Sequence, residues 1–325
     1  MIHPRGPKLA ALAALALLTA ACGPEQHDHA GAAAVDPATL CVSSDCGSVV
    51  EQLTIPDAEN ILFSDDGRLF VSGGLNVYEI TRDDGGLVAN ALYQGSCNFT
   101  GLAIIGDVLY ANCFDGRLYA ARLTAAPALQ PIHALGLAAP NGLVAGPDHD
   151  LYLVNGPLAT TALPDPKIVR LTLDPADPFT VQEQTDWFSA GLLGPNGLQR
   201  SGRTLYVSNT GLGGLGEIRT VTINADNTAG ASTQLASFLS VPDDFSLIDN
   251  YILSSWYLSG QIALIDPQGS VIANTDIGSF SFPSQVRVGR PPLFPPEDLL
   301  ITEKGLIGDT GSSIGNVLSV FRRNG

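Results

Sequence analysis

Four oxygen-bearing side chains occupy matching points of this sequence. The phrase Pro-Asn-Gly-Leu occurs at residues 140–143 and again at 195–198, each time before a turn and an apolar strand. Glu59 and Asp243 stand at the corresponding place before two other strands of this kind. Carboxylate and amide oxygens are hard ligands, and two carboxylates balance the charge of one divalent cation. The sequence therefore predicts a metal site, which we assign to Glu59, Asn141, Asn196 and Asp243.

The donor types also favour a particular metal. No His or Cys accompanies the four residues, which favours Ca²⁺ or Mg²⁺ over Zn²⁺ or Cu²⁺. Ca²⁺ is the expected cofactor because it accepts mixed carboxylate and carbonyl ligands, with water completing its shell. The alternative is that the two Asn are turn residues and the two acids are solvated loop residues, with no metal between them.

Six repeats must position these residues. Predicted strands begin at residues 59, 100, 141, 196, 243 and 284, at intervals of 41, 41, 55, 47 and 41 residues. Each is followed by an apolar strand and then by a third strand, with Gly, Pro and Asp between them and no sustained helical period. This spacing is typical of propeller blades. We predict an all-β fold, a six-bladed β-propeller of four-stranded antiparallel blades.

The ring geometry explains why the phrase returns. Innermost strands of a propeller run side by side along one channel, so their first residues form a ring at its mouth. That predicted ring consists of Glu59, Thr100, Asn141, Asn196, Asp243 and Ser284. The sixth repeat lacks an outermost strand, and the segment "SVVEQLTIP" at 48–56 precedes the first repeat. We expect this N-terminal strand to pair with the last blade and close the ring.

The blade starts also resemble a known superfamily. The segments "AENILFSDDGRLFVS", "PNGLVAGPDHDLYLVN", "PNGLQRSGRTLYVSN" and "PDDFSLIDNYILSSW" are similar to those of the gluconolactonase and senescence-marker-protein propellers, to which paraoxonase-like and strictosidine-synthase-like proteins are related. The resemblance covers roughly residues 48–325. It implies that Glu59, Asn141, Asn196 and Asp243 hold a catalytic divalent metal, and that Asp244 would be a further ligand.

Two classes of function follow from this resemblance. The first is metal-dependent hydrolysis of a small lactone or ester, with Asp243 or its neighbour Asp244 as the general base. The chain departs from the family because Thr100 replaces the His of paraoxonase-like members. The segment "CNFTG" also lacks the Arg that gluconolactonases carry on the second blade. The second class is a non-enzymatic cell-envelope propeller, which binds a ligand or protein at its rim and holds a structural Ca²⁺ in its channel.

The N-terminus predicts export. Residues 1–21 have a basic start and a short apolar core and resemble a bacterial lipoprotein signal peptide, which would make Cys22 the lipidated residue. An ordinary secretory signal cut near Ala21 is the alternative. Residues 22–47 are expected to be a flexible tether, and residues 48–325 the propeller. We therefore expect a cell-envelope lipoprotein, on the periplasmic or cell-surface side of a membrane to which a lipid anchor attaches it.

Cysteine spacing and charge complete the sequence-based expectations. Cys97 and Cys113 flank a predicted hairpin turn at Gly106-Asp107 and should face each other, which leaves Cys41 and Cys46 to form a second disulfide. The 325 residues carry a formal net charge of −16, which excludes a nucleic-acid partner because phosphate backbones are also anionic. We expect a monomer.

Overall fold

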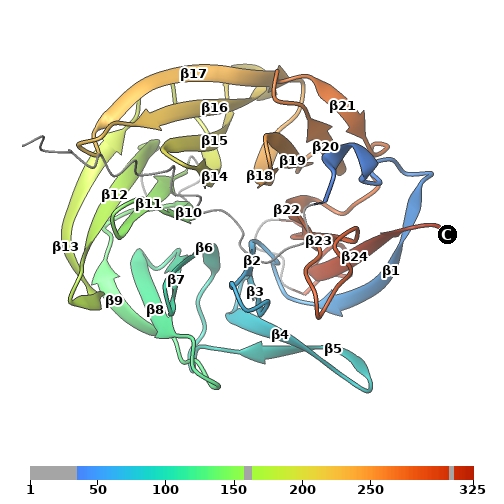
Figure 1. Cartoon of the computed structure of the whole chain (residues 1–325), viewed down its shortest axis with the longest axis horizontal. Coiled ribbons are helices and arrows are strands. Elements are labelled where there is room, and N and C mark those ends of the chain that lie inside the picture. Colours follow the sequence, from blue (N-terminus) through green and yellow to red (C-terminus); the bar gives the residue numbers. More distant parts are fainter. Residues whose placement is uncertain (1–34, 157–162, 307–310) are drawn as a thin grey trace, which may run out of the picture.

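The prediction of a six-bladed β-propeller is confirmed. A computed structural model describes residues 35–156, 163–306 and 311–325, which form six four-stranded antiparallel sheets. Figure 1 looks along the axis of the ring and shows the sheets arranged around it as blades. Among the described residues, helical structure is limited to two short 3₁₀ turns, η1 (Pro37–Thr39) and η2 (Leu212–Gly214).

Five blades are built outward from the channel in sequence order, and the blade of β22, β23 and β24 takes its outermost strand from β1. The innermost strands are β2 (Ile61–Phe63), β6 (Phe99–Ile105), β10 (Pro140–Ala145), β14 (Pro195–Ser201), β18 (Pro242–Ile248) and β22 (Pro283–Val288). The second strands are β3 (Leu69–Ser72), β7 (Val108–Cys113), β11 (Asp150–Asn155), β15 (Thr204–Thr210), β19 (Tyr251–Trp256) and β23 (Leu299–Glu303).

The third and fourth strands complete the blades toward the outside. The third strands are β4 (Val77–Asp83), β8 (Arg117–Arg122), β12 (Lys167–Asp174), β16 (Gly216–Ile223), β20 (Gln261–Ile265) and β24 (Val317–Arg323). The outermost strands are β5 (Gly86–Ala91), β9 (Gln130–Ala134), β13 (Asp177–Phe188), β17 (Ala229–Phe238), β21 (Val271–Asn274) and β1 (Gly47–Thr54).

The ring is closed as predicted. Strand β1 pairs antiparallel with β24, so the blade that contains the C-terminal strands takes its outermost strand from the N-terminal part of the chain. The first and last blades are therefore tied together, and the outer edge of β24 is covered.

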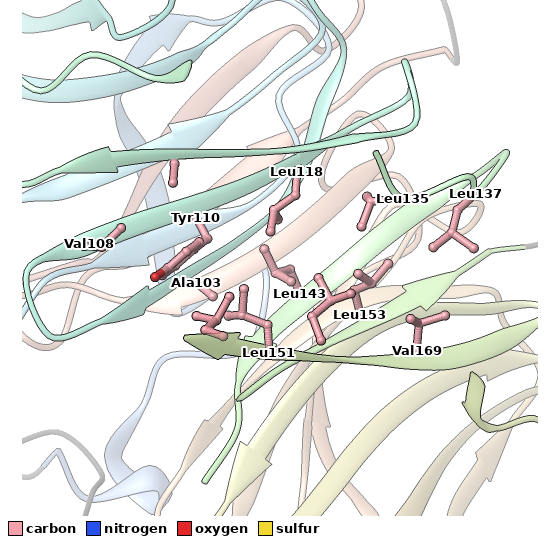
Figure 2. Close-up of a cluster of buried hydrophobic side chains, with 13 residues drawn as sticks. Ala103, Val108, Tyr110, Leu118, Leu135, Leu137, Leu143, Leu151, Leu153 and Val169 are labelled. Atoms are coloured by element: carbon pink, nitrogen blue, oxygen red, sulfur yellow. The ribbon is translucent and has the colours of Figure 1, made fainter. Parts of the chain in front are cut away.

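Packing between neighbouring blades supplies the core. The second strands β7, β11 and β19 are almost fully buried on both faces, because each blade is flanked by two others. Figure 2 shows one such layer, in which Tyr110 and Leu118 of one blade face Leu143, Leu151 and Leu153 of the next. The outer strands carry the exposed polar residues, as in β13.

The packed domain begins before residue 48, where the propeller was expected to start. Leu40 and Val42 are buried against Phe280 and Phe321, between the last two blades. The expected tether therefore does not extend to residue 47 as a free segment. Residues 1–34, which include the signal segment and Cys22, lie outside the described residues.

Both expected disulfides are present. Cys41 pairs with Cys46, and Cys97 pairs with Cys113 with their Cα atoms 6.2 Å apart. The predicted register is wrong in one detail, because Cys113 lies opposite Phe99 and Cys97 precedes the strand. An irregularity in the pairing between Phe99 and Leu102 shifts the alignment.

Candidate metal and catalytic site

The predicted ring residues share one backbone position. In five blades the pairing between the first and second strands is irregular just after the inner strand begins. The residues at these bulges include Thr100, Asn141, Asn196, Asp243 and Ser284. Glu59 lies two residues before β2, and its N–H donates to the Ser72 carbonyl at 2.9 Å. The repeated Pro-Asn-Gly phrase is therefore a strand bulge and not a turn.

The glycine of each phrase serves the packing of neighbouring blades. A Cβ atom on Gly142 would lie 2.6 Å from the Asn196 carbonyl oxygen. A Cβ atom on Gly197 would lie 2.3 Å from the Asp244 Oδ1 atom. Neither glycine has a positive φ, so close approach and not conformational freedom requires these glycines.

Hydrogen bonds between blades fix the ring. In five of the six blades, a side chain at the end of the second strand donates to the carbonyl of the ring residue in the following blade. The donors and acceptors are Ser72 to Thr100, Asn112 to Asn141, Ser208 to Asp243, Ser255 to Ser284, and Thr302 to Glu59. Val154, which has no donor, occupies this place in the third blade. These bonds hold the bulges, and hence their side chains, in fixed positions around the channel.

Three carboxyls and one ammonium form a buried group at the mouth, the end of the channel where the inner strands begin. We call Asp57, Glu59, Asp243 and Lys304 the mouth group. Each is at most 7% exposed. The Lys304 Nζ atom is hydrogen-bonded to Glu59 Oε2 and lies 3.2 Å from Asp57 Oδ1. Asp57 Oδ2 accepts a hydrogen bond from Asn98 at 3.0 Å.

Burial dominates the proton affinities of Asp243 and Glu59. It raises the pKa of Asp243 well above the ordinary value, and the nearby Glu59 carboxyl adds to the rise. Burial also raises the pKa of Glu59, against the opposing effect of the Lys304 ammonium. The charged forms of both acids are thus costly where they stand, and a further positive charge in the mouth would offset that cost.

Two oxygens of the predicted ligand set have no partner. Asn196 Oδ1 and Asp243 Oδ1 are buried without a hydrogen bond in the described part of the chain. Buried acceptors of this kind ordinarily find a donor, a water or a cation. Three carboxylates and one ammonium also leave two negative charges in the mouth group when all are ionised. The donor set and its charge therefore fit a divalent cation.

Asp244 lies in a separate network that crosses the channel. Its Oδ2 accepts hydrogen bonds from Asn60 at 2.5 Å and from Gln285 at 2.8 Å. Its Oδ1 accepts from the Phe245 N–H at 2.7 Å and from Gln199 at 3.1 Å. Burial raises the pKa of Asp244 to about 6, although these donors oppose the rise. Adjacent residues of a strand point in different directions, which explains why Asp244 does not join the mouth group.

The sequence did not reveal Lys304. It follows "LLITE" directly, so its place after the second strand of the sixth blade was the available signal, because residues at that point lie on the mouth side. Asp57 was missed because it precedes the repeat unit by two residues. Asn141 is half-buried, whereas Glu59 and Asp243 are buried.

Other potential sites are less suited to chemistry. Among the described residues, one cluster of three metal-binding side chains is found, Cys97, Cys113 and Asp115. Its two sulfurs are joined in a disulfide and are not available as thiolates. Two shallow cavities, of about 230 and 300 Å³, lie at the outer part of the propeller, lined by residues such as Ser48 and Phe321 or Lys167 and Trp187.

Comparisons with known proteins support the fold. No family model and no curated protein matches this sequence. Among solved structures, a calcium-binding protein, regucalcin, from Agrobacterium tumefaciens is 15% identical, with a TM-score of 0.63 over 85% of this chain and 92% of that chain. A putative gluconolactonase is 16% identical, with a TM-score of 0.61 over 87% and 94%.

A third neighbour has a different activity. The PQQ-bound aldose sugar dehydrogenase of Streptomyces coelicolor is 15% identical, with a TM-score of 0.60 over 86% of this chain and 98% of that chain. Because these identities are low, the likeness concerns the fold, and function must be argued from the site. The chain has the six-bladed propeller fold shared by regucalcin, gluconolactonase and aldose sugar dehydrogenase, as the resemblance in the sequence implied.

Proposed function

We propose that the protein is a divalent-metal-dependent hydrolase of small lactones or esters, with Ca²⁺ as the metal. The observation that carries this proposal is the pair of buried, unpartnered oxygens, Asn196 Oδ1 and Asp243 Oδ1, beside a mouth group with excess negative charge. The fold likeness to a calcium-binding regucalcin and a putative gluconolactonase is consistent with it.

Glu59, Asn141, Asn196 and Asp243 would hold the cation. All four lie at or just before the start of an inner strand, and the hydrogen bonds between blades fix their backbone. Lys304 is a departure from a simple ligand set, because its ammonium already binds Glu59. We propose that Lys304 compensates Asp57 and Glu59 when no metal is bound and limits how tightly the site binds a cation.

The remaining chemistry belongs to the chain's own residues. A divalent cation at this site would polarise a lactone or ester carbonyl and acidify water. Asp243 would accept the proton of the attacking water, because its carboxylate would lie at the metal that acidifies this water. Asp244, held by four donors, would act as a positioning residue that keeps the bulge of Asp243 in place.

A non-enzymatic role with a structural Ca²⁺ is the second candidate. The observation that favours it is that the two cavities described above lie away from the mouth. In this role the cation would pin the blades together, and the rim would bind a ligand or a protein partner. A lack of turnover together with calcium-dependent stability would support it.

Hydrolysis of a lactone and aryl-ester panel, with chelator or with added Ca²⁺, tests the proposal. We expect calcium-dependent hydrolysis by the parent protein and at least a hundredfold loss with Asp243→Asn, because this variant lacks the proposed base. Thr100→Ala is the matched control, since Thr100 is on the ring but outside the ligand set, and it should keep most of the activity. Equal activity with and without calcium would contradict the proposal.

We also propose that the protein is exported and lipidated at Cys22. The two disulfides are compatible with an oxidising compartment. In the described part of the chain, no helix is long and apolar enough to cross a membrane. A lipid at Cys22 would then attach the propeller to the cell envelope.

A further inference from the structure

The two faces of the propeller differ in the chain segments that form them. Inner strands all begin at the mouth, so two kinds of connection lie on the mouth face: those that enter an inner strand and those that join second to third strands. Hydrogen bonds join these connections to each other. Thr210 N–H donates to the Gly194 carbonyl at 2.9 Å, and Tyr257 N–H donates to the Val241 carbonyl at 2.9 Å.

The mouth face carries exposed apolar side chains over the fourth and fifth blades. Five successive connections, 189–194, 211–215, 239–241, 257–260 and 275–282, each present at least one. We call these residues the apolar arc: Leu193, Leu212, Leu215, Leu239, Leu258 and Ile277. Their exposed fractions run from 50% for Leu193 to 89% for Leu239. Asp276 is the only charged residue in the five connections.

The opposite face of the same two blades has the reverse character. Its turns, at 202–203, 224–228, 249–250 and 266–270, contain no large apolar residue. They contain the charged residues Arg203, Asp226, Asp249 and Asp266. An apolar side chain that a short loop exposes to water does not stabilise the fold. Such side chains repeat on the mouth face and are absent from the opposite turns, which indicates that the mouth face is covered when the protein functions.

We infer that the apolar arc docks the mouth face onto an electrically neutral lipid surface. Leucine and isoleucine tips fit lipid because insertion into an acyl layer needs apolar area and no directional contact. Protein interfaces are instead enriched in aromatic residues, Met and Arg, and Leu is under-represented among their hot spots. The five connections contain no Arg and no Met, the two non-aromatic residue types that protein interfaces favour.

Charge and layout select the kind of surface. The chain carries a formal net charge of −16, so an anionic surface would repel it, whereas an uncharged surface would not. The arc extends over five connections that follow the ring, which suits a flat surface better than the groove of a peptide. Docking here would bring the mouth to the lipid, because Tyr257, next to Leu258, also donates to the Gly305 carbonyl beside Lys304. The inference does not depend on the metal or on hydrolysis.

Vesicle co-sedimentation tests the inference. Full-length chains carrying Cys22→Ser, which removes the proposed lipidation residue, would be mixed with vesicles of pure phosphatidylcholine or of phosphatidylcholine with phosphatidylserine. One variant combines Leu239→Ser, Leu258→Ser and Ile277→Ser. The matched control combines Val49→Ser, Val50→Ser and Ile272→Ser, which are 41–50% exposed on the outer strands β1 and β21.

We expect the arc variant to bind phosphatidylcholine at least tenfold more weakly than the control, and both to bind weakly when phosphatidylserine is present. Leu239→Ser alone, at the most exposed position of the arc, should show a loss of about threefold if the combined variant does not fold. Equal binding by the arc variant and the control would overturn the inference. So would sedimentation velocity showing that the arc variant has lost a dimer that the control keeps, because the arc would then join two copies of the chain.

Discussion

Replacing Lys304 by Met would separate two expected effects of this lysine. It stabilises the carboxyls of the mouth group when no metal is bound, and it weakens the binding of a cation. Lys304 is 7% exposed and binds Glu59 and Asp57, so the change removes a buried positive charge while keeping an apolar stem of similar length. Without metal, the carboxyls lose their compensating ion. With metal, the cation no longer shares the mouth with an ammonium.

The structure gives the direction and size of both effects. Removing one partner of a buried ion pair costs about 3–5 kcal/mol, so the metal-free variant should unfold roughly 6–10 °C earlier. Two cations that share one carboxylate lie about 5 Å apart, and at an effective dielectric constant of about 20 an ammonium and a divalent cation repel by about 7 kcal/mol. Part of this gain is lost to solvent and relaxation, and we expect at least a tenfold rise in Ca²⁺ affinity.

Thermal unfolding with chelator, followed by calorimetric titration with Ca²⁺, measures both quantities. Arg322→Met is the matched control, because Arg322 pairs at 2.6 Å with the fully buried Asp298 on the opposite face. It should lower the melting temperature without changing the Ca²⁺ affinity. A Lys304→Met protein that is folded and binds Ca²⁺ with the parent's affinity would refute the placement of the cation beside Glu59.

Further predictions concern acids, packing, the disulfide and export. In chelator, the free energy of unfolding should fall as the pH rises from 5 to 7.5 in urea titrations, because Glu59, Asp243 and Asp244 have raised pKa values. The folded state then binds more protons than the unfolded state. For Asp244, whose pKa rises from 3.8 to about 6, the loss of stability between pH 5 and pH 7.5 is about 1.5 kcal/mol. Stability that rises over this range would contradict the assignment. Gly142→Ala should destabilise the protein by about 1–3 kcal/mol and weaken Ca²⁺ binding, because its Cβ would meet the Asn196 carbonyl, whereas Gly211→Ala, with 3.4 Å of space, should be nearly neutral. Replacing Cys97 and Cys113 by Ser should cost about 2–4 kcal/mol in urea unfolding, and an unchanged midpoint would argue against a stabilising bridge. Cys22→Ser should abolish fatty-acid labelling and release the protein from membranes, and a variant that keeps its label would exclude lipidation at this residue.

Repetition made the fold predictable from the sequence. Six strand sets in the same order allow few architectures, and the missing outermost strand of the last blade predicted its pairing with the N-terminal strand. The ring of Thr100, Asn141, Asn196, Asp243 and Ser284 followed from that symmetry alone. Residues that obey the repeat can be placed by counting, because each blade copies the position of the one before it.

Residues that depart from the repeat could not be placed in this way. Lys304 has no counterpart among the other blades, where Gly74, Phe114, Gly156, Thr210 and Tyr257 occupy the equivalent point at or just after the end of the second strand. Its ion pair with Glu59 joins residues 245 positions apart. The separation of Asp243 from Asp244 also required the structure, because only its contacts with Asn60 and Gln285 show that Asp244 belongs to a different layer.

Calorimetric titration of Ca²⁺ into the chelator-treated protein, alongside its Asn196→Ala variant, tests the metal site most directly. Asn196 Oδ1 is buried without a hydrogen bond, so removing this oxygen breaks no hydrogen bond of its own and should affect chiefly the cation. We predict one binding event per chain in the parent protein, with a calcium-dependent rise in melting temperature, and the loss of both in the variant. No binding heat and no thermal shift in the parent protein, or equal binding by the variant, would contradict the metal site.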